Sequence, residues 1–573
     1  MKTVVATLNA KYIHMNLAIR YLKAYAAPEY EVELAEYTIK DPPLQIVSDL
    51  FNRKPDVIGF SCYIWNIEET VKVIQICKKV MPDVKIILGG PEVSYDVEYW
   101  LRRLPEIDCI VMGEGEATFK ELLSVIIEGE SYENVAGICY LDNGKVKINP
   151  PREKIDLRTM PSPFRFEEDI EQLPSRIVYI ETSRGCPFNC QFCLSSIEIG
   201  VRFFNREKIK DDLRYLMANG AKTIKFIDRT FNISRSYAME IFQFLIDEHV
   251  PGTVFQFEIT ADIMRPEVIK FLNKNAPEGL FRFEIGVQST NDYTNELVKR
   301  RQDFEKLSRT VKMIKEGGKI VQHLDLIAGL PEEDYASFRK TFNDVFALRP
   351  EELQLGFLKL LRGTGLRIEA KRWNYQFMDY APYEVLSNNR LSFSDIVRIK
   401  QVEDILEKYW NDHRMDTTIE YIVSNCFETP FDFFQEFGAY WDENGWAKIG
   451  HQLEDLFTRL HSFIKDNSFP QGSQNVSLMK YGYRKKWWSD TIDKNEKRHV
   501  YTAVKSTDLP DHIQQLSERE WFKNIIVEHV SLNVTKYAKT KEIDETGCYL
   551  IVYYDGKSNC EAFTVEKSMI EGN

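Results

Sequence analysis

The sequence contains no run that approaches the roughly 20 apolar residues of a membrane-spanning helix, and its first residues have no apolar core of the signal-peptide type. We therefore expect a cytoplasmic protein. A net charge of −13 and a pI near 5.5 argue against a chain whose main task is to bind nucleic acid. Cysteine is scarce, with 10 residues in 573. Because cytoplasmic thiols stay reduced, a tight group of cysteines predicts metal ligation or redox chemistry before it predicts disulfides.

The length predicts several domains, because 573 residues exceed what one hydrophobic core usually serves. The first is expected over residues 1–140, where short apolar runs alternate with helical patterns. One helix is predicted over 66–80, with Asn66 as its cap and Glu69 three residues on, as in a capping box. Buried strands separated by helices predict a doubly wound α/β sheet of the Rossmann or flavodoxin-like kind.

Ligands of such a sheet bind beyond the carboxyl ends of its strands. These ends carry glycines and small polar residues here, and glycine allows a large ligand to approach the backbone. Glycine-rich turns of this kind are also common in α/β proteins without a ligand there. The candidate contact residues are Ser61, Cys62, Gly89, Gly90, Gly113, Glu114, Gly115 and Glu116.

A hairpin and a proline-rich connector are predicted next, over residues 141–175, with Asn143 and Gly144 at a type I′ turn. Six further strand-like runs alternate with helices over residues 176–370 and predict a partial (β/α)6 barrel, open on one side. One helix of this barrel, predicted to end at Gly220, has a clear buried face. That face consists of Ile209, Leu213, Leu216 and Met217.

A separate α+β domain is expected over residues 371–573, where aromatic-rich helices precede two strand-like runs, 525–534 and 548–556. Its sequence suggests no chemistry. Residues 484–488, RKKWW, combine charge and aromatic rings as nucleic-acid grooves do, although a solvated turn anchored by its tryptophans is the favoured interpretation.

Three cysteines lie within eight positions, Cys186, Cys190 and Cys193, directly after the first predicted barrel strand. Thiolates suit iron–sulfur clusters and zinc, but structural zinc usually takes four protein ligands, and the closest histidine in the sequence is His249. A C-x3-C-x2-C spacing instead leaves one iron of a [4Fe–4S] cluster without a protein ligand, so that a substrate can bind there. The scattered Cys139, Cys426, Cys548 and Cys560 are expected to be small buried hydrophobes.

The segment CPFNCQFC, with an aromatic residue before its third cysteine, resembles the motif of radical S-adenosylmethionine (SAM) enzymes. The resemblance implies that the open iron binds SAM and that electron transfer cleaves it to a 5′-deoxyadenosyl radical. It also implies that Asp228, at the end of the second barrel strand, faces the methionine amine and belongs to the catalytic set with the three cysteines. The SAM contacts implied in this way are Phe192, Asp228, Glu258, Gln288, Ser289, Ile327 and Gly329.

The segments GFSCYIWN, IILGGPEV and IDCIVMGEGEATF, which precede this motif, are similar to the cobalamin-binding domain of cobalamin-dependent radical SAM enzymes. Many cobalamin domains hold cobalt through a histidine in a D-x-H-x-x-G loop, which this sequence lacks, and relatives in the radical group also lack it. We expect Tyr12, His14 or Asn16 near the corrin because they follow the first strand at its ligand end. For His14, a helix-capping role is an equally good interpretation.

The resemblance implies a cobalamin-dependent radical SAM enzyme, most directly a methyltransferase acting at an unactivated carbon or at phosphorus. Its substrate would be a small molecule or peptide, and its electron donor a reductase or a flavodoxin-type protein. One alternative is a transfer-RNA methylthiotransferase, whose second cluster would need Cys62, Cys77 and Cys109 to converge, and their positions argue against this. Another is a cobalamin or redox sensor without turnover. The sequence identifies no substrate.

Overall fold

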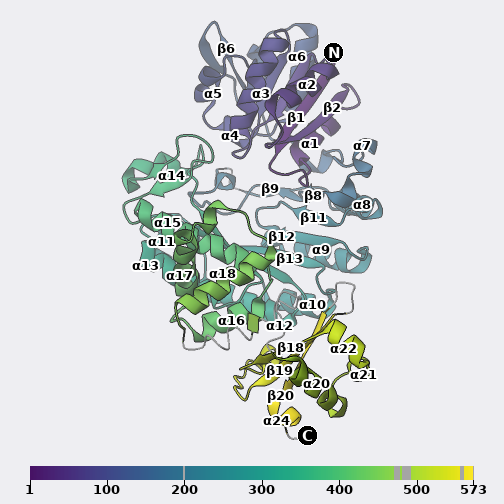
Figure 1. Cartoon of the computed structure of the whole chain (residues 1–573). Coiled ribbons are helices and arrows are strands. Elements are labelled where there is room, and N and C mark those ends of the chain that lie inside the picture. Colours follow the sequence, from purple (N-terminus) through teal and green to yellow (C-terminus); the bar gives the residue numbers. More distant parts are fainter. Residues whose placement is uncertain (198–199, 470–477, 480–491, 555–559, 572–573) are drawn as a thin grey trace. The chain divides into compact units, whose positions relative to one another are not determined.

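The computed structural model describes residues 1–197, 200–469, 478–479, 492–554 and 560–571 (Figure 1). The RKKWW segment at 484–488 lies outside these residues. The chain divides into two compact units, Met1–Ile396 and Val397–Asn573. No helix in the described ranges is both long and apolar enough to cross a membrane.

The N-terminal sheet has the strand order β2-β1-β3-β4-β5-β6-β7. Its first five strands are parallel, and the last two are added antiparallel at one edge. The predicted doubly wound sheet is thereby confirmed, with an antiparallel hairpin as an extension. The strands are β1 Thr3–Asn9, β2 Val32–Thr38, β3 Val57–Ser61, β4 Lys85–Gly89, β5 Cys109–Val111, β6 Ile138–Asp142 and β7 Lys145–Ile148.

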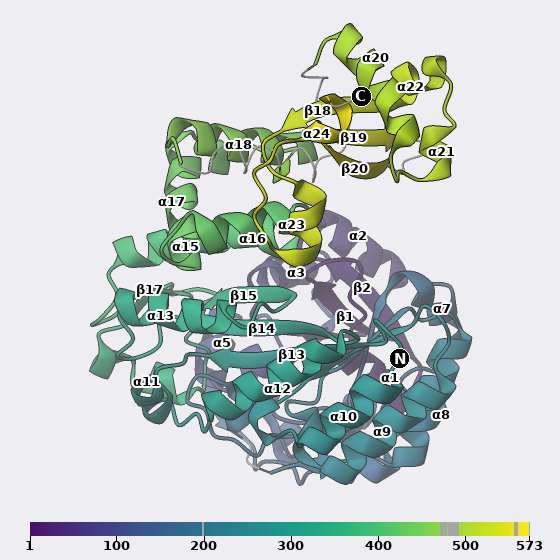
Figure 2. The ribbon, with the colours of Figure 1, turned by 90° about the horizontal axis from the view of Figure 1, so that it is seen from below.

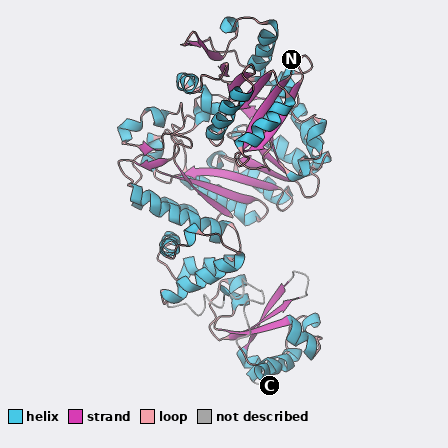
Figure 3. Cartoon of the chain, turned by 45° about the horizontal axis from the view of Figure 1, so that its top comes forward, coloured by secondary structure: helices cyan, strands magenta, loops and turns pink. Residues whose placement is uncertain are grey.

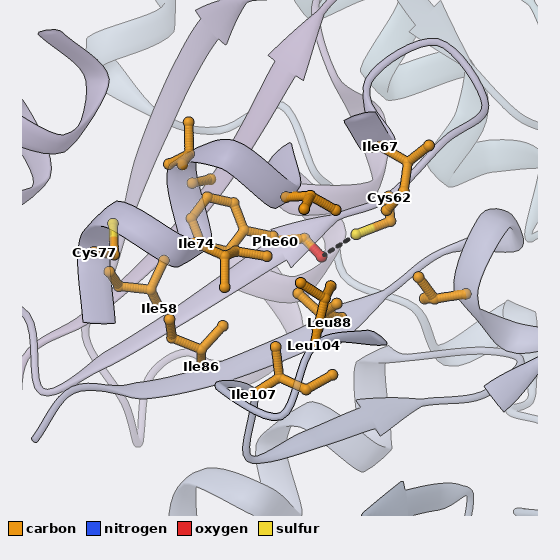
Figure 4. Close-up of a cluster of buried hydrophobic side chains, with 14 of the residues drawn as sticks. Ile58, Phe60, Cys62, Ile67, Ile74, Cys77, Ile86, Leu88, Leu104 and Ile107 are labelled. Carbon is orange, nitrogen blue, oxygen red and sulfur yellow. Dashed lines mark hydrogen bonds between the residues drawn. The ribbon is translucent and has the colours of Figure 1, made fainter. Parts of the chain in front are cut away.

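Helices cover both faces of this sheet. On one face, α1 (Leu17–Ala26) and α6 (Glu116–Glu128) pack over a core that contains Cys109. On the other face, α2 (Pro43–Arg53), α3 (Ile67–Val80) and α5 (Val97–Arg103) enclose a core that contains Cys62 and Cys77 (Figure 4). The three cysteines therefore belong to two separate cores and do not converge, as the sequence indicated.

The capping box predicted at Asn66 is wrong. The side chain of Asn66 makes no capping hydrogen bond to α3. It accepts instead from the Tyr63 amide at 2.8 Å and donates to the carbonyls of Leu8 at 3.1 Å and Ser61 at 3.0 Å. Because Asn66 is buried, its amide group must satisfy nearby backbone groups, and it joins the carboxyl ends of β1 and β3.

The hairpin of β6 and β7 turns at Asn143 and Gly144, whose φ angles of 47° and 76° are both positive. Two positive values at the centre of a two-residue loop define the predicted type I′ turn. The connector that follows contains the short helix α7 (Glu167–Ile170). This helix is tied to the N-terminal domain by the buried ion pair between Asp169 and Arg20.

The second sheet of the first unit has six parallel strands in the order β15-β14-β13-β12-β11-β8. Helices α8, α9, α10 and α12 run along its outer side (Figure 2). The predicted partial barrel is confirmed. Its strands are β8 Ile177–Ile180, β11 Thr223–Phe226, β12 Val254–Glu258, β13 Phe281–Gln288, β14 Val321–Ala328 and β15 Glu352–Phe357; the helices are α8 Arg206–Ala218, α9 Arg235–Glu248, α10 Pro266–Asn275 and α12 Phe304–Gly317.

Helix α8 also matches its prediction. The four residues predicted for its inner face are all buried. Gly220 follows its end with a φ of +83°, a conformation that favours glycine. The helix is thereby held against the barrel beside the cysteine loop.

The inner face of the barrel is polar. Along β14, buried residues that face the outer helices alternate with half-buried ones such as His323 and Asp325. His323 lies 2.9 Å from Asp325 and 3.0 Å from Glu352. Across the intervening strand β12, Lys225 Nζ on β11 lies 2.6 Å from Glu284 Oε2 on β13. The barrel interior thus presents paired charges.

The free edge of β8 is closed by the segment after β1. The Met15 amide donates to the Ile177 carbonyl at 3.3 Å, and the Ile177 amide donates to the Ile13 carbonyl at 2.7 Å. Backbone groups at this edge of the sheet thereby gain hydrogen-bond partners. The pairing brings the ligand end of the N-terminal sheet to the first barrel strand.

The second unit combines helices with an antiparallel sheet of β18, β19 and β20, as the predicted α+β class requires (Figure 3). The strands β18 and β19 were predicted, whereas β20 was not. Of the scattered cysteines, Cys139 and Cys548 are buried and Cys426 is half-buried. The elements are α15 Phe393–Leu406, which begins before the boundary, α16 Asp416–Asn425, α17 Pro430–Glu443, α18 Leu453–Asp466, α20 Lys494–Ala503, α21 Asp511–Gln514, α22 Glu518–Asn524, β18 Ile525–Val530, α23 Val534–Thr540, β19 Cys548–Tyr554, β20 Cys560–Glu566 and α24 Lys567–Glu571.

Candidate functional site

The cysteine loop leaves the carboxyl end of β8 and is bracketed by two short paired strands, β9 (Ser183–Arg184) and β10 (Arg202–Phe203). Within the loop, the Ser196 hydroxyl oxygen lies 2.7 Å from the Cys190 carbonyl and 2.6 Å from the Cys193 carbonyl, so the two carbonyls share its one proton. The Gly200 amide donates to the Cys186 carbonyl at 3.1 Å. These hydrogen bonds hold all three cysteines in one folded loop.

The three thiols fit an iron–sulfur cluster. Burial raises the pKa of Cys186 and of Cys190. The electrostatic effect of the neighbouring Cys193 raises both values further. In the described ranges, no three His, Cys, Asp or Glu side chains converge tightly enough to share one metal ion. In a [4Fe–4S] cluster each cysteine would bind a different iron. Iron would also stabilise the thiolate forms that burial disfavours.

Asp228 is completely buried beside the start of this loop. Its carboxylate accepts hydrogen bonds from the Thr182 amide at 3.1 Å, the Thr182 hydroxyl at 2.7 Å and the Ser183 hydroxyl at 2.5 Å. Burial raises its pKa, and these donors oppose that shift. Asp228 therefore orients the backbone that leads into the cysteine loop, and its contact with SAM stays a prediction.

The other predicted SAM contacts lie at different depths. Glu258 faces the cavity described below, and burial raises its pKa. Gln288 occupies an irregularity of β13 with a φ of 67°, and its buried Oε1 has no hydrogen-bond partner among the described residues. Ser289 is buried and donates to Glu333 at 2.5 Å. Glu258 and Gln288 can thus receive a ligand. The hydroxyl of Ser289 is instead used to hold the loop after β13 in place through Glu333.

Three predicted contacts remain. Phe192 is half-buried in the cysteine loop, and Ile327 lies on the inner face of β14. Gly329 has a φ of +98°, and a Cβ there would lie 2.7 Å from Val385. Its carbonyl accepts from the Tyr375 hydroxyl at 2.8 Å, so this position allows close packing after β14.

A cavity of about 790 Å³ lies where the strand ends of the N-terminal sheet meet the barrel. Most of the predicted cobalamin contacts line it. Tyr12 does not: its ring is exposed and lies beneath Arg176, 4.6 Å from the guanidinium. Cys62 faces the core, with Sγ 3.7 Å from the Phe60 carbonyl (Figure 4). The lining includes His14, Asn16, Ser61, Gly89, Gly90, Gly113, Glu114, Gly115 and Glu116.

The cavity has room for a large ligand, and one part of the cavity extends deep into the N-terminal domain. The cavity reaches past the strand ends to Gly59 and Phe119, where a Cβ on Gly59 would already contact the ring at 3.4 Å. Gly90 has a φ of +110°, and a Cβ there would lie 2.5 Å from the Cys62 carbonyl oxygen. The rim carries the stacked rings of Tyr63 and Trp65, with centroids 4.3 Å apart. A flat macrocycle with an extended tail, such as cobalamin, suits this shape.

His14 projects into this cavity from the segment that pairs with β8. Its Nδ1 lies 2.7 Å from the Tyr179 hydroxyl. Burial lowers the pKa of His14, and the charges of Lys11, Lys225 and Arg176 lower it further. The imidazole is therefore neutral near pH 7, the form that binds metals.

Several residues of the site were not predicted from the sequence. On the barrel side the cavity is lined by Tyr179, Lys225 and Arg229, and near the cysteine loop by Arg184 and Arg202. The alternation of polar residues along the barrel strands could have indicated Tyr179 and Lys225. No sequence signal marks the two arginines, because Glu114 and Glu116, with which they pair, lie in another domain.

The fold and the site define an α/β chain in which a doubly wound domain shares a ligand cavity with a partial barrel that carries three cysteines after its first strand. Family models match residues 3–123 as a B12 binding domain, residues 180–345 as the radical SAM superfamily and residues 371–552 as a protein of unknown function, DUF4080. Residues 180–345 therefore form a radical SAM domain, and a B12 binding domain precedes it at residues 3–123.

Individual relatives agree with this assignment. The chain is 32% identical to an uncharacterized methyltransferase of Pyrococcus horikoshii over 235 residues, which is 39% of this chain and 51% of the relative. It is 25% identical to the cobalamin-dependent radical SAM methyltransferase TokK of Streptomyces tokunonensis over 385 residues, 64% of this chain and 56% of the relative. The chain spans about half the length of these curated relatives.

A solved structure shares the fold. The cobalamin-dependent S-adenosylmethionine radical enzyme OxsB, with aqua-cobalamin and S-adenosylmethionine bound, is 17% identical. Its TM-score is 0.55, and the superposition covers 91% of this chain and 83% of that chain.

Proposed function

We propose that this chain is a cobalamin-dependent radical SAM enzyme that transfers a methyl group to an unactivated carbon or to phosphorus. The observation that carries the proposal is the single cavity that the cobalamin-type loops of the N-terminal domain share with Lys225, Arg229 and Glu258 of the barrel. A methyl donor and a radical generator that act on one substrate must lie close together, and a cavity that reaches from the N-terminal sheet to the barrel strands supports the proposal. When bound, the cluster and SAM would supply the radical, and cobalamin would carry the methyl group.

The residues of the chain hold and orient these groups. Cys186, Cys190 and Cys193 would bind the cluster, and Asp228 orients the strand end from which their loop departs. Glu258 and Gln288 present polar groups at the carboxyl ends of β12 and β13, where SAM would bind. These roles follow from position and hydrogen bonding.

Residues of the N-terminal domain would hold cobalamin on the other side of the cavity. Gly59 lies at the deep end of the cavity, Gly90 lets its loop pack against the Cys62 carbonyl, and Ser61 is oriented by its hydrogen bond to Thr7 at 2.7 Å. His14 is the residue whose imidazole would hold the cobalt of cobalamin. The neutral state of its imidazole supports this assignment.

Methyl transfer is proposed because two relatives of the chain are named methyltransferases. The substrate is proposed to be a small molecule or peptide that enters from the polar interior of the barrel. An external reductase or flavodoxin-type donor would supply the electron.

The test measures iron and cobalt per chain after anaerobic reconstitution with iron, sulfide and hydroxocobalamin. We expect about four irons and one cobalt in the wild type, and loss of the iron alone in Cys186→Ala/Cys190→Ala/Cys193→Ala. Cys139→Ala, which removes a buried cysteine outside the loop, is the matched control and should keep both metals. Iron without cobalt in the wild type would refute cobalamin-dependent methyl transfer.

A second measurement separates an enzyme from a sensor. The reduced wild-type protein should cleave SAM slowly to 5′-deoxyadenosine even without substrate, and the triple alanine variant should not. A wild-type protein with both cofactors but no cleavage would indicate a cobalamin or redox sensor.

A further inference from the structure

A buried ion-pair cluster connects the cobalamin-type loop after β5 to the cysteine loop of the barrel. Arg184 is at its centre. Its Nη2 lies 2.6 Å from Glu116 Oε1 and 2.7 Å from Glu181 Oε1, and its Nη1 lies 3.4 Å from Glu114 Oε1. Arg202 makes a second ion pair with Glu114. The side chains of Arg184 and Glu116 are only 16% and 6% exposed, so neither charge can rely on water instead of its partner.

The position of this cluster in the chain links two sites. Glu114 and Glu116 follow β5 and line the cavity, and Glu116 is the first residue of α6. Arg184 lies two residues before Cys186 and is the register partner of Arg202 on the strand that leaves the loop. Both ends of the cysteine loop are therefore attached, through arginine, to the same cobalamin-type loop.

Glu116 also points to a ligand. One carboxylate oxygen, Oε1, pairs with Arg184, whereas Oε2 is buried and has no hydrogen-bond partner among the described residues. A buried carboxylate oxygen without a donor is unfavourable. Since Glu116 lines the cavity, a ligand that carries N–H donors, such as the amide side chains around a corrin, would satisfy it.

We propose that Arg184 is a positioning residue that couples cobalamin binding to the geometry of the cysteine loop. The proposal rests on the proposed function, because it takes cobalamin and the cluster as the two ligands. A ligand that orders Glu114 and Glu116 also orders Arg184, and through it the backbone at Cys186. By linkage, a filled cluster must then tighten cobalamin binding by the same factor.

The experiment measures the dissociation constant of hydroxocobalamin by absorption titration of the full chain, with the cluster reconstituted and with the iron removed. In the wild type we expect the cluster to tighten binding about tenfold, within the range usual for coupled sites. In Arg184→Gln the ratio of the two constants should fall to about one, since the link is broken. Arg214→Gln removes an exposed arginine that pairs with Asp211 and Glu248 on the barrel surface, and it should keep the wild-type ratio.

The outcomes are distinct. If Arg184→Gln weakens binding equally with and without the cluster and keeps the ratio, Arg184 contacts the ligand directly and the positioning role is refuted. A wild-type ratio of one refutes the coupling while the proposed function stands. A wild-type protein that binds no cobalamin refutes both.

A second variant guards against misfolding. Arg202→Gln removes the partly exposed arginine and leaves the pairs of Arg184 in place, so we expect an intermediate ratio. A wild-type ratio in this folded variant, together with loss of fold in Arg184→Gln, would refute the coupling role of the ion-pair cluster.

Discussion

The hydroxyl of Tyr179 lies 2.7 Å from Nδ1 of His14 and joins the first barrel strand to the loop after the first strand of the N-terminal domain. This hydrogen bond sets the orientation of the imidazole within the shared cavity. Partners of this kind usually orient a metal-ligating histidine. It connects the two domains at the point where cobalamin would bind.

We expect His14→Ala to change the absorption spectrum of bound cobalamin, because the substitution removes the imidazole that would bind cobalt. Tyr179→Phe should keep the ligand and weaken cobalamin binding about tenfold, as loss of an orienting partner does. His249→Ala, at the end of α9, is the control. Identical spectra for His14→Ala and the wild type would exclude His14 as a cobalt ligand.

Arg20→Met should destabilise the first unit by about 3–5 kcal/mol, because it leaves the buried Asp169 carboxylate without its cation and leaves Glu36 with Arg176 alone. Arg20 is 2% exposed, and its guanidinium binds both oxygens of Asp169, at 2.8 and 2.7 Å, and Glu36 at 2.9 Å. Urea denaturation followed by circular dichroism measures the change. Arg102→Met breaks only an exposed pair with Glu98 and should change stability by less than about 1 kcal/mol. Equal effects of the two substitutions would contradict this prediction.

Gly90→Ala should abolish cobalamin binding or weaken it by at least about tenfold. The new Cβ would lie 2.5 Å from the Cys62 carbonyl, and the φ of +110° disfavours alanine, so the loop must move. Cobalt content after reconstitution measures the effect. Gly144→Ala is the matched control, since its φ is also positive but open space surrounds it, and there we expect only a loss of stability of about 1 kcal/mol. Full cobalt loading in Gly90→Ala would show that the loop does not contact the ligand.

The raised pKa of His323 predicts that the free energy of unfolding depends on pH. Burial opposes its protonation, but Asp325 and Glu352 outweigh burial and raise its pKa to about 10, while Arg282 and Gln354 complete its surroundings. Because the folded pKa lies above the unfolded one, this contribution to stability is complete below pH 6.5 and is lost as pH rises through about 10. Each pKa unit corresponds to about 1.4 kcal/mol.

The wild type should therefore lose more unfolding free energy between pH 6 and pH 9 than His323→Gln does, by a few kcal/mol. Urea titrations at the two pH values measure this difference. His249→Gln serves as the control. Parallel pH profiles for the wild type and His323→Gln would show that His323 does not cause the pH dependence of stability.

The periodicity of apolar residues was sufficient to predict both α/β sheets, because buried strands and one-faced helices have different repeats. The Asn143-Gly144 turn followed from its dihedral requirements. Strand β20 was missed because its run, CEAFTVE, has few consecutive apolar residues and gains its place only by pairing with β19. Asn66 was assigned to a cap because local spacing does not reveal which distant carbonyls a buried amide must satisfy.

The sequence by itself determined the elements, the cysteine motif and the glycine-rich strand ends, since each depends on residues close together in the chain. Only the tertiary structure decided which side chains meet. Arg184 and Glu116 are separated by 68 positions, and Arg20 and Asp169 by 149. Such pairs depend on how two domains pack, and a charged residue in the sequence carries no mark of its partner. The shared cavity, and with it the coupling proposed for Arg184, is therefore a property of the folded chain.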